Sequence, residues 1–318
     1  MTRERTAEQL GRAVGTLIAS AAGDALGAGY EFSIPASDAV IGMIGGGPFG
    51  FEPGEWTDDT SMSIAVAEAA AAQEDLRSES GLDSVAAGFM RWFGSEPKDI
   101  GNQTRTVLSA NPTSAAEMAA AAKAVVGLTG GNGSQMRTSP VALAHLDDEQ
   151  ACVAAALAVS DLTHSDLRAG QACQLWSYAI RHAVLFGSFD GVRMYLDTVD
   201  REQRDYWTGI LEAAETGSPS DFAKNGWVVH ALQTAWWAIS GTDDSKPDHL
   251  REALVQCVRA GNDTDTTAAI AGGLLGARWG VAAVPAEWLE VLHGGPGLGP
   301  DDLESLARQA VQVQVQAR

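Results

Sequence analysis

The sequence predicts an all-α protein in which residues 1–318 form one large domain. Alanine-rich stretches carry apolar residues three and four positions apart, and this spacing collects the apolar side chains on one face of a helix. No run of alternating β-branched residues is long enough to predict a strand of a sheet. The breaks between the helical stretches are short and rich in glycine or proline, without a long flexible linker or a repeat of fixed period.

The first predicted helix covers the apolar residues 14–22. The small-residue segment "GDALGAGYEF" follows, and it contains Asp24 and Glu31. Its simplest interpretation is a helix that ends at Gly27 or Gly29, with both acids in solvent. Clear helical spacing returns in residues 60–73, 114–126, 149–160 and 168–186.

The chain is strongly acidic, with a formal net charge of −20 and a pI near 4.5. This charge argues against nucleic acid or an anionic membrane as the main partner. The apolar runs are shorter than the roughly 20 residues of a membrane span. Cys152, Cys173 and Cys257 lack the spacing of a zinc site or a disulfide framework. We therefore expect a cytoplasmic, monomeric protein with reduced thiols.

Two consecutive acids follow a threonine in "EWTDDTSMSIAVAEA". Thr57 is suited to the N-cap of a helix, and Asp58 and Asp59 then occupy the first turn, where the helix dipole favours negative charge. The same carboxylate and hydroxyl oxygens are donors that Mg²⁺ and Mn²⁺ prefer. The pattern therefore predicts either an acidic helix cap or part of a cation site.

A second acidic cluster lies in "GNDTDTTAAIAGGLLGA", directly before the almost uncharged residues 268–277. Asp263, Asp265 and Thr266 offer the same donors as the first cluster. Positions i and i+2 do not share a helix face, so we expect these groups on the turn into the helix. The glycines within residues 268–277 allow close packing, and a buried helix end with several carboxylates requires cations. Together the clusters favour a metal site over two unrelated caps.

Two other motif classes resemble these clusters but need a different context. The "DTDTT" of residues 263–267 matches the DxDxT of phosphatases that form an aspartyl phosphate, but that motif follows a strand of a parallel sheet. The "DDTSM" of residues 58–62 lacks the second acid of the DDxxD motif of terpene synthases. Both classes are improbable here.

Three further stretches carry residues able to contact a ligand. The glycine-rich residues 130–140, "GGNGSQMRTSP", lack the lysine of a P-loop, but their amides could bind a pyrophosphate. His164 lies in "LTHSD", and a single histidine is more often a structural hydrogen-bonding group. Asp99 follows a helix end predicted near Pro97, and its simplest interpretation is an N-cap of the next helix.

Taken in order, the segments "GDALGAGYEF", "WTDDTSM", "DIGN", "GNGSQMR", "TH", "GWVV" and "GNDTDTTAAIAGGLLGA" resemble the ADP-ribosylglycohydrolase family. The resemblance extends from about residue 11 to about residue 280, and the ordered set is much more specific than any single motif. It implies a multi-helix orthogonal bundle with a binuclear Mg²⁺ or Mn²⁺ centre at the floor of a site for ADP-ribose.

The resemblance also implies roles for individual residues. Asp265 would lie between the two cations, and Glu31 would contact or gate the centre. The predicted catalytic residues are Glu31 and Asp59, either of which could accept a proton from the attacking water, and Asp99. Asp99 and Asn102 match positions that face the guanidinium group in the arginine-specific branch. The implied metal ligands are Thr57, Asp58, Asp59, Asp263, Asp265 and Thr266.

The chain departs from many relatives in two places. It has "SDLRAG" where they have a proline after the TH pair, and it has Asn262 where they have a glycine. Neither departure removes an implied ligand of the metals. The residues implied to line the ADP-ribose site are Asn132, Gly133, Ser134, Met136 and His164.

These assignments predict a metal-dependent hydrolase that removes mono-ADP-ribose from protein side chains, at the N-glycosidic bond to arginine. Two divalent cations would orient the ribose hydroxyls and a water molecule. The alternatives are O-linked ADP-ribose on serine or an acetyl group, ADP-ribose on a nucleic-acid base, and a non-catalytic ADP-ribose-binding relative. The intact ligand set argues against the last alternative, and Asp99 with Asn102 argues for arginine. The partners would be an ADP-ribosylated protein as substrate and ADP-ribose as product.

Overall fold

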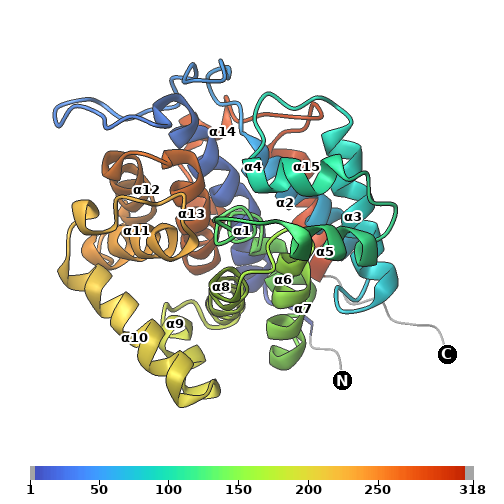
Figure 1. Cartoon of the computed structure of the whole chain (residues 1–318). Helices are drawn as coiled ribbons and strands as arrows, with labels where there is room; N and C mark the ends of the chain where they lie inside the picture. Colours follow the sequence, from blue (N-terminus) through green and yellow to red (C-terminus); the bar gives the residue numbers. More distant parts are fainter. Residues whose placement is uncertain (1–3, 312–318) are drawn as a thin grey trace.

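Two helices from opposite ends of the sequence, α1 (Ala7–Gly27) and α13 (Thr264–Trp279), form the centre of the computed structural model (Figure 1). The structure describes residues 4–311, so the ends of the predicted domain at 1–3 and 312–318 lie outside it. Small buried residues make up most of both helices, so that the two backbones can lie close together.

Glycine permits the contact of α1 with α13 at both ends of the pair. A Cβ atom at Gly27 would overlap the backbone of Asp265, and one at Gly276 would overlap the backbone of Gly15. The prediction that glycines within residues 268–277 allow close packing is therefore confirmed. As a consequence, the start of α13 is buried against the end of α1.

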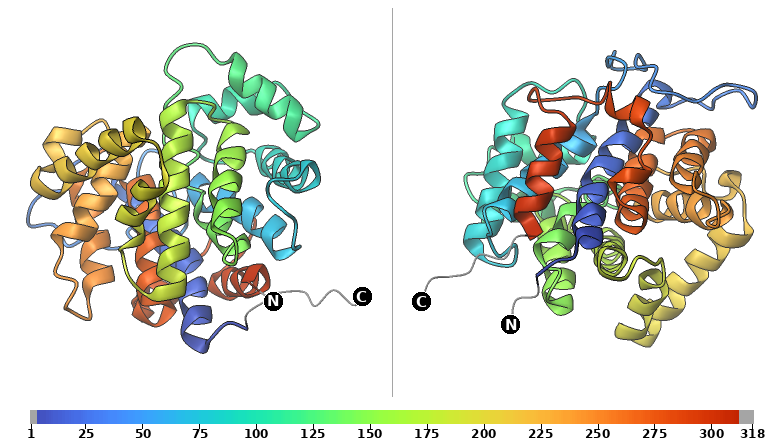
Figure 2. Two further views of the ribbon diagram at one scale, coloured as in Figure 1. Left: turned by 90° about the horizontal axis from the view of Figure 1, so that it is seen from below. Right: turned by 180° about the vertical axis from the view of Figure 1, so that it is seen from behind.

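The other helices surround this central pair. On one side α11 (Val228–Gly241) and α12 (His249–Ala260) pack against α13 (Figure 1). On the other side α15 (Pro300–Val311) packs against both α1 and α2 (Asp58–Ala71), as the view from behind shows (Figure 2). The long helix α8 (Leu167–Phe186) packs against α13 and α7 (Glu149–Asp161) and completes the core.

The all-α prediction is confirmed for residues 4–311, where strand-like pairing is limited to isolated bridges. No helix in this part of the chain is long and apolar enough to cross a membrane. The four stretches with helical spacing correspond to α2, α5, α7 and α8. The remaining helices are α3 (Glu79–Phe93), α4 (Asn102–Ser109), α5 (Ala115–Ala124), α6 (Ser139–Ala144), α7 (Glu149–Asp161), α9 (Gly191–Met194), α10 (Arg201–Thr216), α14 (Ala286–Leu289) and the 3₁₀ turns η1 (Ala28–Tyr30), η2 (Tyr195–Thr198), η3 (Pro219–Phe222) and η4 (Val281–Ala283).

Two local interpretations of the sequence are wrong. The first predicted helix does end at Gly27, but Asp24 and Glu31 are buried rather than solvated. Asp24 faces the start of α2, a contact between segments that periodicity cannot reveal. The helix expected to end near Pro97 already ends at Phe93.

Candidate metal centre

The start of α2 is held by a buried carboxylate of α1. Asp24 accepts hydrogen bonds from Thr57 N at 3.0 Å, Thr60 N at 3.0 Å and Thr60 Oγ1 at 2.6 Å. Burial raises the pKa of Asp24 to about 6, and these hydrogen bonds oppose the rise. Thr57 is the N-cap of α2, as predicted, and its Oγ1 accepts from Asp59 N at 3.4 Å. With the helix start satisfied in this way, the carboxylates of Asp58 and Asp59 are not needed as caps.

The two acidic helix starts meet in the interior. Thr57 Oγ1 of α2 and Thr266 Oγ1 of α13 both donate to Asp59 Oδ2, each at 3.3 Å. Asp58, Asp59 and Asp265 are all buried. The structure thus brings together two clusters that lie about 200 residues apart in the sequence.

Glu31 joins the cluster from the segment that follows α1. One carboxylate oxygen from each of Glu31, Asp263 and Asp265 lies within 4.8 Å of the others. Phe32 N donates to Asn262 O at 2.6 Å, which ties the segment after Glu31 to the segment before Asp263. Phe32 and Asn262 have φ values of +58° and +63°, a strained conformation that is often found at functional sites. Asparagine tolerates this conformation, so Asn262 fits where many relatives have glycine.

Three buried carboxylate oxygens of this cluster have no hydrogen-bond partner within the described residues: Glu31 Oε2, Asp59 Oδ1 and Asp265 Oδ1. Burial, together with the neighbouring carboxylates, raises the pKa of Glu31 to about 9. The same causes hold the pKa values of Asp58, Asp59 and Asp265 well above their usual range. Buried carboxylates without a countercharge are unfavourable, and hard divalent cations take oxygen ligands of this kind. The residues present therefore fit the cations that the sequence implied.

Asp263 is oriented by two asparagines from other segments. Asn132 Nδ2 donates to Asp263 Oδ2 at 2.8 Å and to Asn225 O at 2.9 Å. Asp263 N donates to Asn225 Oδ1 at 3.1 Å. Asn132 belongs to the glycine-rich loop of residues 130–140, so this network attaches the loop to the carboxylate cluster. Asn225 was not predicted, because a single asparagine before "GWVV" carries no recognisable pattern.

His164 faces the glycine-rich loop in a defined tautomer. Arg137 Nη2 donates to Thr163 Oγ1 at 2.6 Å, and a guanidinium group can only donate. A hydroxyl can accept two hydrogen bonds but has one proton to donate, and His164 Nδ1 at 2.8 Å is the one acceptor that the described residues offer to Thr163 Oγ1. A hydroxyl that donates to Nδ1 places the ring proton on Nε2. Burial, with a contribution from Arg137, lowers the pKa of His164 to about 3, so the ring is neutral. A Cβ atom at Gly133 would lie only 3.2 Å from His164 Nε2, which makes glycine the fitting residue there.

Arg137 supports the same loop from its buried side. Its Nη1 donates to Gly133 O at 2.6 Å, and its guanidinium carbon lies 4.6 Å from the ring centre of Phe89. Burial lowers the pKa of Arg137 to about 10. The sequence did not single out Arg137 as a functional residue. The only available signal was its place in "GNGSQMR", which does not reveal a fully buried side chain.

The remaining predicted contacts occupy three different environments. Ser134 and Met136 are buried, whereas Asn102 is exposed in the first turn of α4. Asp99 is partly buried, and burial raises its pKa to about 6. The N-cap of α4 is Gly101, without a side-chain hydrogen bond, so the interpretation of Asp99 as that cap is wrong.

Comparisons with known proteins agree with the motifs. The family model described as ADP-ribosylglycohydrolase matches residues 5–318. The ADP-ribosylarginine hydrolase Tri1 of Pseudomonas putida (strain GB-1) is 31% identical over 307 residues, which covers 90% of this chain and 75% of that protein. The ADP-ribosyl dinitrogen reductase glycohydrolase of Rhodospirillum rubrum is 30% identical over 286 residues, or 88% and 90% of the two chains. A solved structure described as an ADP-ribosylglycohydrolase-related protein complex has a TM-score of 0.75 at 25% identity, and the match covers 96% of this chain and 99% of that one.

Proposed function

Because the chain belongs to the ADP-ribosylglycohydrolase family, we propose that it hydrolyses the N-glycosidic bond between ADP-ribose and an arginine side chain of a modified protein. The observation that carries this proposal is the buried carboxylate cluster, in which Glu31, Asp59 and Asp265 each retain an oxygen without a partner in the described chain. The choice of arginine is supported by relatives at about 30% identity that are named for ADP-ribosylarginine.

Two divalent cations, Mg²⁺ or Mn²⁺, would be held by the carboxylates and threonine hydroxyls at the starts of α2 and α13. When bound, they would offset the buried negative charge, orient the ribose hydroxyls and make water a stronger nucleophile. Glu31 Oε2 and Asp59 Oδ1 are buried oxygens without a partner among residues 4–311, so they are suited to hold the proton of the attacking water. Asp265, at the start of α13, would be one of the carboxylates that hold the cations.

The glycine-rich loop would bind the phosphates of ADP-ribose. A neutral His164 with its proton on Nε2 is a hydrogen-bond donor directed at the loop glycines, which suits a phosphate or ribose oxygen. Asn132 donates to Asp263, so this hydrogen bond holds the loop and the carboxylate cluster together. Asp99 would contact the guanidinium group on the other side of the scissile bond.

The proposed function is tested by the release of free ADP-ribose from arginine-, serine- and acetyl-linked substrates in the presence of Mn²⁺. We expect release from the arginine-linked substrate, loss of activity after chelation, and recovery when Mg²⁺ or Mn²⁺ is returned. Cleavage of only the serine- or acetyl-linked substrates would contradict the arginine assignment. Full activity after exhaustive chelation would contradict the metal centre itself.

A further inference from the structure

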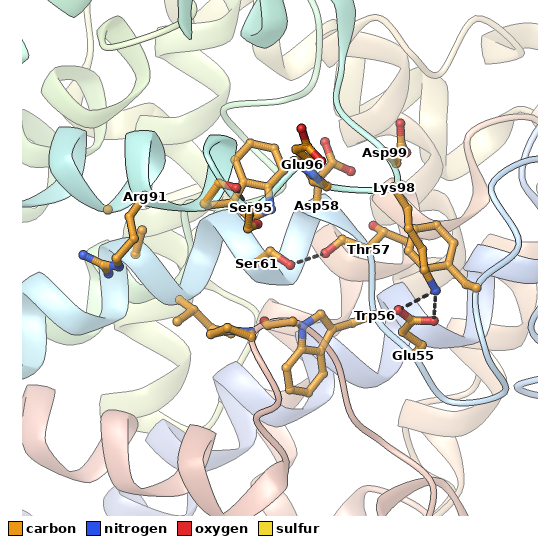
Figure 3. A pocket seen from close by; sticks show the side chains of 18 of the residues that line it. Glu55, Trp56, Thr57, Asp58, Ser61, Arg91, Ser95, Glu96, Lys98 and Asp99 are labelled. Atoms are coloured by element: carbon orange, nitrogen blue, oxygen red, sulfur yellow. Dashed lines mark hydrogen bonds and ion pairs between the residues drawn. The ribbon is translucent and has the colours of Figure 1, made fainter. Parts of the chain in front are cut away.

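A cavity adjoins the candidate metal centre between α2, α3 and the segment that follows α3 (Figure 3). It has a volume of about 450 Å³, and Thr57, Asp58 and Asp99 form part of its wall. Residues 130–140 of the glycine-rich loop, and His164, do not line it. The cavity therefore adjoins the proposed active site at Asp99 and Asp58 without including the residues expected to bind ADP-ribose.

The charges around this cavity are unbalanced. Its lining residues include two cationic side chains, and both already have acidic partners: Arg91 pairs with Glu68, and Lys98 Nζ lies 2.8 and 2.7 Å from the two carboxylate oxygens of Glu55. The lining contains three further carboxylates, Asp58, Glu96 and Asp99. Asp58 is an implied ligand of the cations and Asp99 is assigned to the guanidinium group of the modified arginine, so Glu96 is the one left without a partner in the described part of the chain. In Figure 3 these three lie along the upper edge of the cavity, and Arg91 lies at its far end.

Glu96 is the exposed member of this group. It lies in the turn after α3 and has a φ value of +55°, a conformation that costs energy for a residue other than glycine. The turn thus holds an acidic side chain at the cavity despite an unfavourable backbone geometry. No ion pair within residues 4–311 involves Glu96, so its charge remains available to a ligand.

Aromatic side chains complete the cavity, because Phe51, Trp56 and Trp92 are among the lining residues. Lys98 Nζ lies 5.3 Å from the ring centre of Phe51, which is a cation–π contact within this cavity. A long basic side chain could place its methylene groups on the aromatic surface and its charge near Glu96. A phosphate would be repelled by Glu96, so the chemistry favours a basic peptide over a nucleic acid.

We propose that this cavity binds the polypeptide next to the modified arginine and selects segments that carry a second basic side chain. The proposal rests on the proposed function, because Asp99 would mark the point at which the modified side chain leaves the active site. The volume of about 450 Å³ is large enough for a side chain together with part of its backbone. The cavity thus selects which modified polypeptides are bound, while the metal centre and the glycine-rich loop bind ADP-ribose.

The test compares three arginine-linked substrates on the Mn²⁺-loaded enzyme: free ADP-ribosylarginine, a peptide with lysines beside the modified arginine, and a matched peptide with glutamates. We expect kcat/KM for the lysine peptide to exceed that for the glutamate peptide and to fall as the salt concentration rises. Glu96→Gln should lower kcat/KM for the lysine peptide about two- to five-fold, the range of an exposed ion pair. Glu96→Lys should lower it further, and both variants should leave free ADP-ribosylarginine unchanged.

A variant that fills the cavity without changing its charge provides a second test. Ser95 is exposed and lines the cavity, so Ser95→Phe should reduce cleavage of both peptides but not of free ADP-ribosylarginine. Glu212→Gln removes an exposed acid on α10, far along the chain from the cavity, and it should change none of the three activities. The proposal is overturned if Glu96 and Ser95 variants cleave all substrates like the wild type, or if they affect free ADP-ribosylarginine and the peptides equally.

A binding measurement separates this proposal from the proposed function. Fluorescence anisotropy with an unmodified lysine-rich peptide should detect binding that weakens in Glu96→Lys. If none of the arginine-linked substrates is cleaved but this binding persists, the proposed function fails and the peptide site stands. If arginine-linked substrates are cleaved but the peptide does not bind in a Glu96-dependent way, the peptide site fails and the proposed function stands.

Discussion

The starts of α8 and α13 both carry aspartates, but these aspartates have different surroundings. Asp166 Oδ1 at α8 accepts from Arg168 N at 2.8 Å and Ala169 N at 3.3 Å, which is the ordinary geometry of an N-cap. At α13 no side chain caps the helix, and Asp265 Oδ1 is buried without a partner in the described chain. An aspartate whose oxygens bind backbone amides stabilises the helix. A buried oxygen without such a partner requires another explanation, and a bound cation supplies one.

The largest effect is expected when one carboxylate oxygen is replaced by an amide nitrogen at the start of α13, and the same replacement at the start of α8 serves as the comparison. Asp265→Asn should lower kcat/KM by more than about a hundredfold. Substitution of residues that only hydrogen-bond to a metal ligand typically lowers activity ten- to a hundredfold, and a ligand itself should matter more. Asp166→Asn is the matched control, and it should stay within about twofold, because asparagine caps a helix about as well as aspartate. Steady-state kinetics in saturating Mn²⁺ measures both. Equal losses in the two variants would show that Asp265 is only another structural carboxylate.

The next largest effect concerns Asp99, which is not a cap either. Asp99→Asn should lower kcat/KM for arginine-linked ADP-ribose about ten- to a hundredfold, because a charge-assisted bond of about 1.5–3 kcal/mol is lost. The affinity for free ADP-ribose, which lacks a guanidinium group, should stay nearly unchanged in calorimetric titrations. A parallel loss of both quantities, or no loss of either, would remove Asp99 from the specificity-determining residues.

A smaller effect is expected at Thr163, between Arg137 and His164. Thr163→Val removes the hydroxyl that fixes the His164 tautomer and leaves a buried guanidinium donor unpaired, so ADP-ribose should bind about tenfold more weakly. Thr163→Ser keeps the hydroxyl and should bind within about twofold of the wild type. The ¹⁵N chemical shifts of the His164 ring provide a direct check, because they distinguish protonated from unprotonated Nε2. A ring proton on Nδ1 in the wild type would contradict the assigned tautomer.

The helix starts that carry the carboxylate cluster could be predicted from the sequence, whereas the contacts between distant segments could not. Thr57 at the start of α2 and the helix that begins after Asp263 follow from capping preferences and apolar spacing within a few residues. The sequence predicts a solvated Asp24, because nothing in "GDALG" shows that this carboxylate faces the amide of Thr57 at the start of another helix. Burial of a polar group depends on which helices pack together, and only the three-dimensional structure supplies that.

The same reasoning applies to the loop and to the cavity. The "GNGSQMR" pattern identified a segment able to bind phosphates, but the burial of Arg137 behind it depends on α3 and α7. The cavity combines residues from α2, from α3 with the turn after it, and from the loop before α15. Glu96 could not be singled out in advance, because an exposed glutamate in a turn is ordinary in an acidic chain.

The smallest predicted effect is a change in thermal stability with pH in the metal-free protein. The pKa of Glu31 is about 9 in the folded chain against 4.5 for an ordinary glutamate, so the folded state holds more protons between these values. Stability should therefore fall as the pH rises through this window, and Asp24 and Asp99, with pKa values of about 6, act in the same direction. We expect a Tm several degrees lower at pH 8 than at pH 5, measured by differential scanning calorimetry. Saturating Mn²⁺ should remove most of this difference. A Tm of the metal-free protein that rises with pH would contradict the raised pKa of these carboxylates.

The central claim is that the unpartnered oxygens at the starts of α2 and α13 bind divalent cations. Isothermal titration of the metal-free protein with Mn²⁺ tests it most directly, with Asp265→Asn and Asp166→Asn measured alongside. The account predicts saturable binding of two Mn²⁺ ions per chain in the wild type and in Asp166→Asn, and strongly weakened binding in Asp265→Asn. Absence of saturable binding in the wild type, or equal binding in all three proteins, would contradict it.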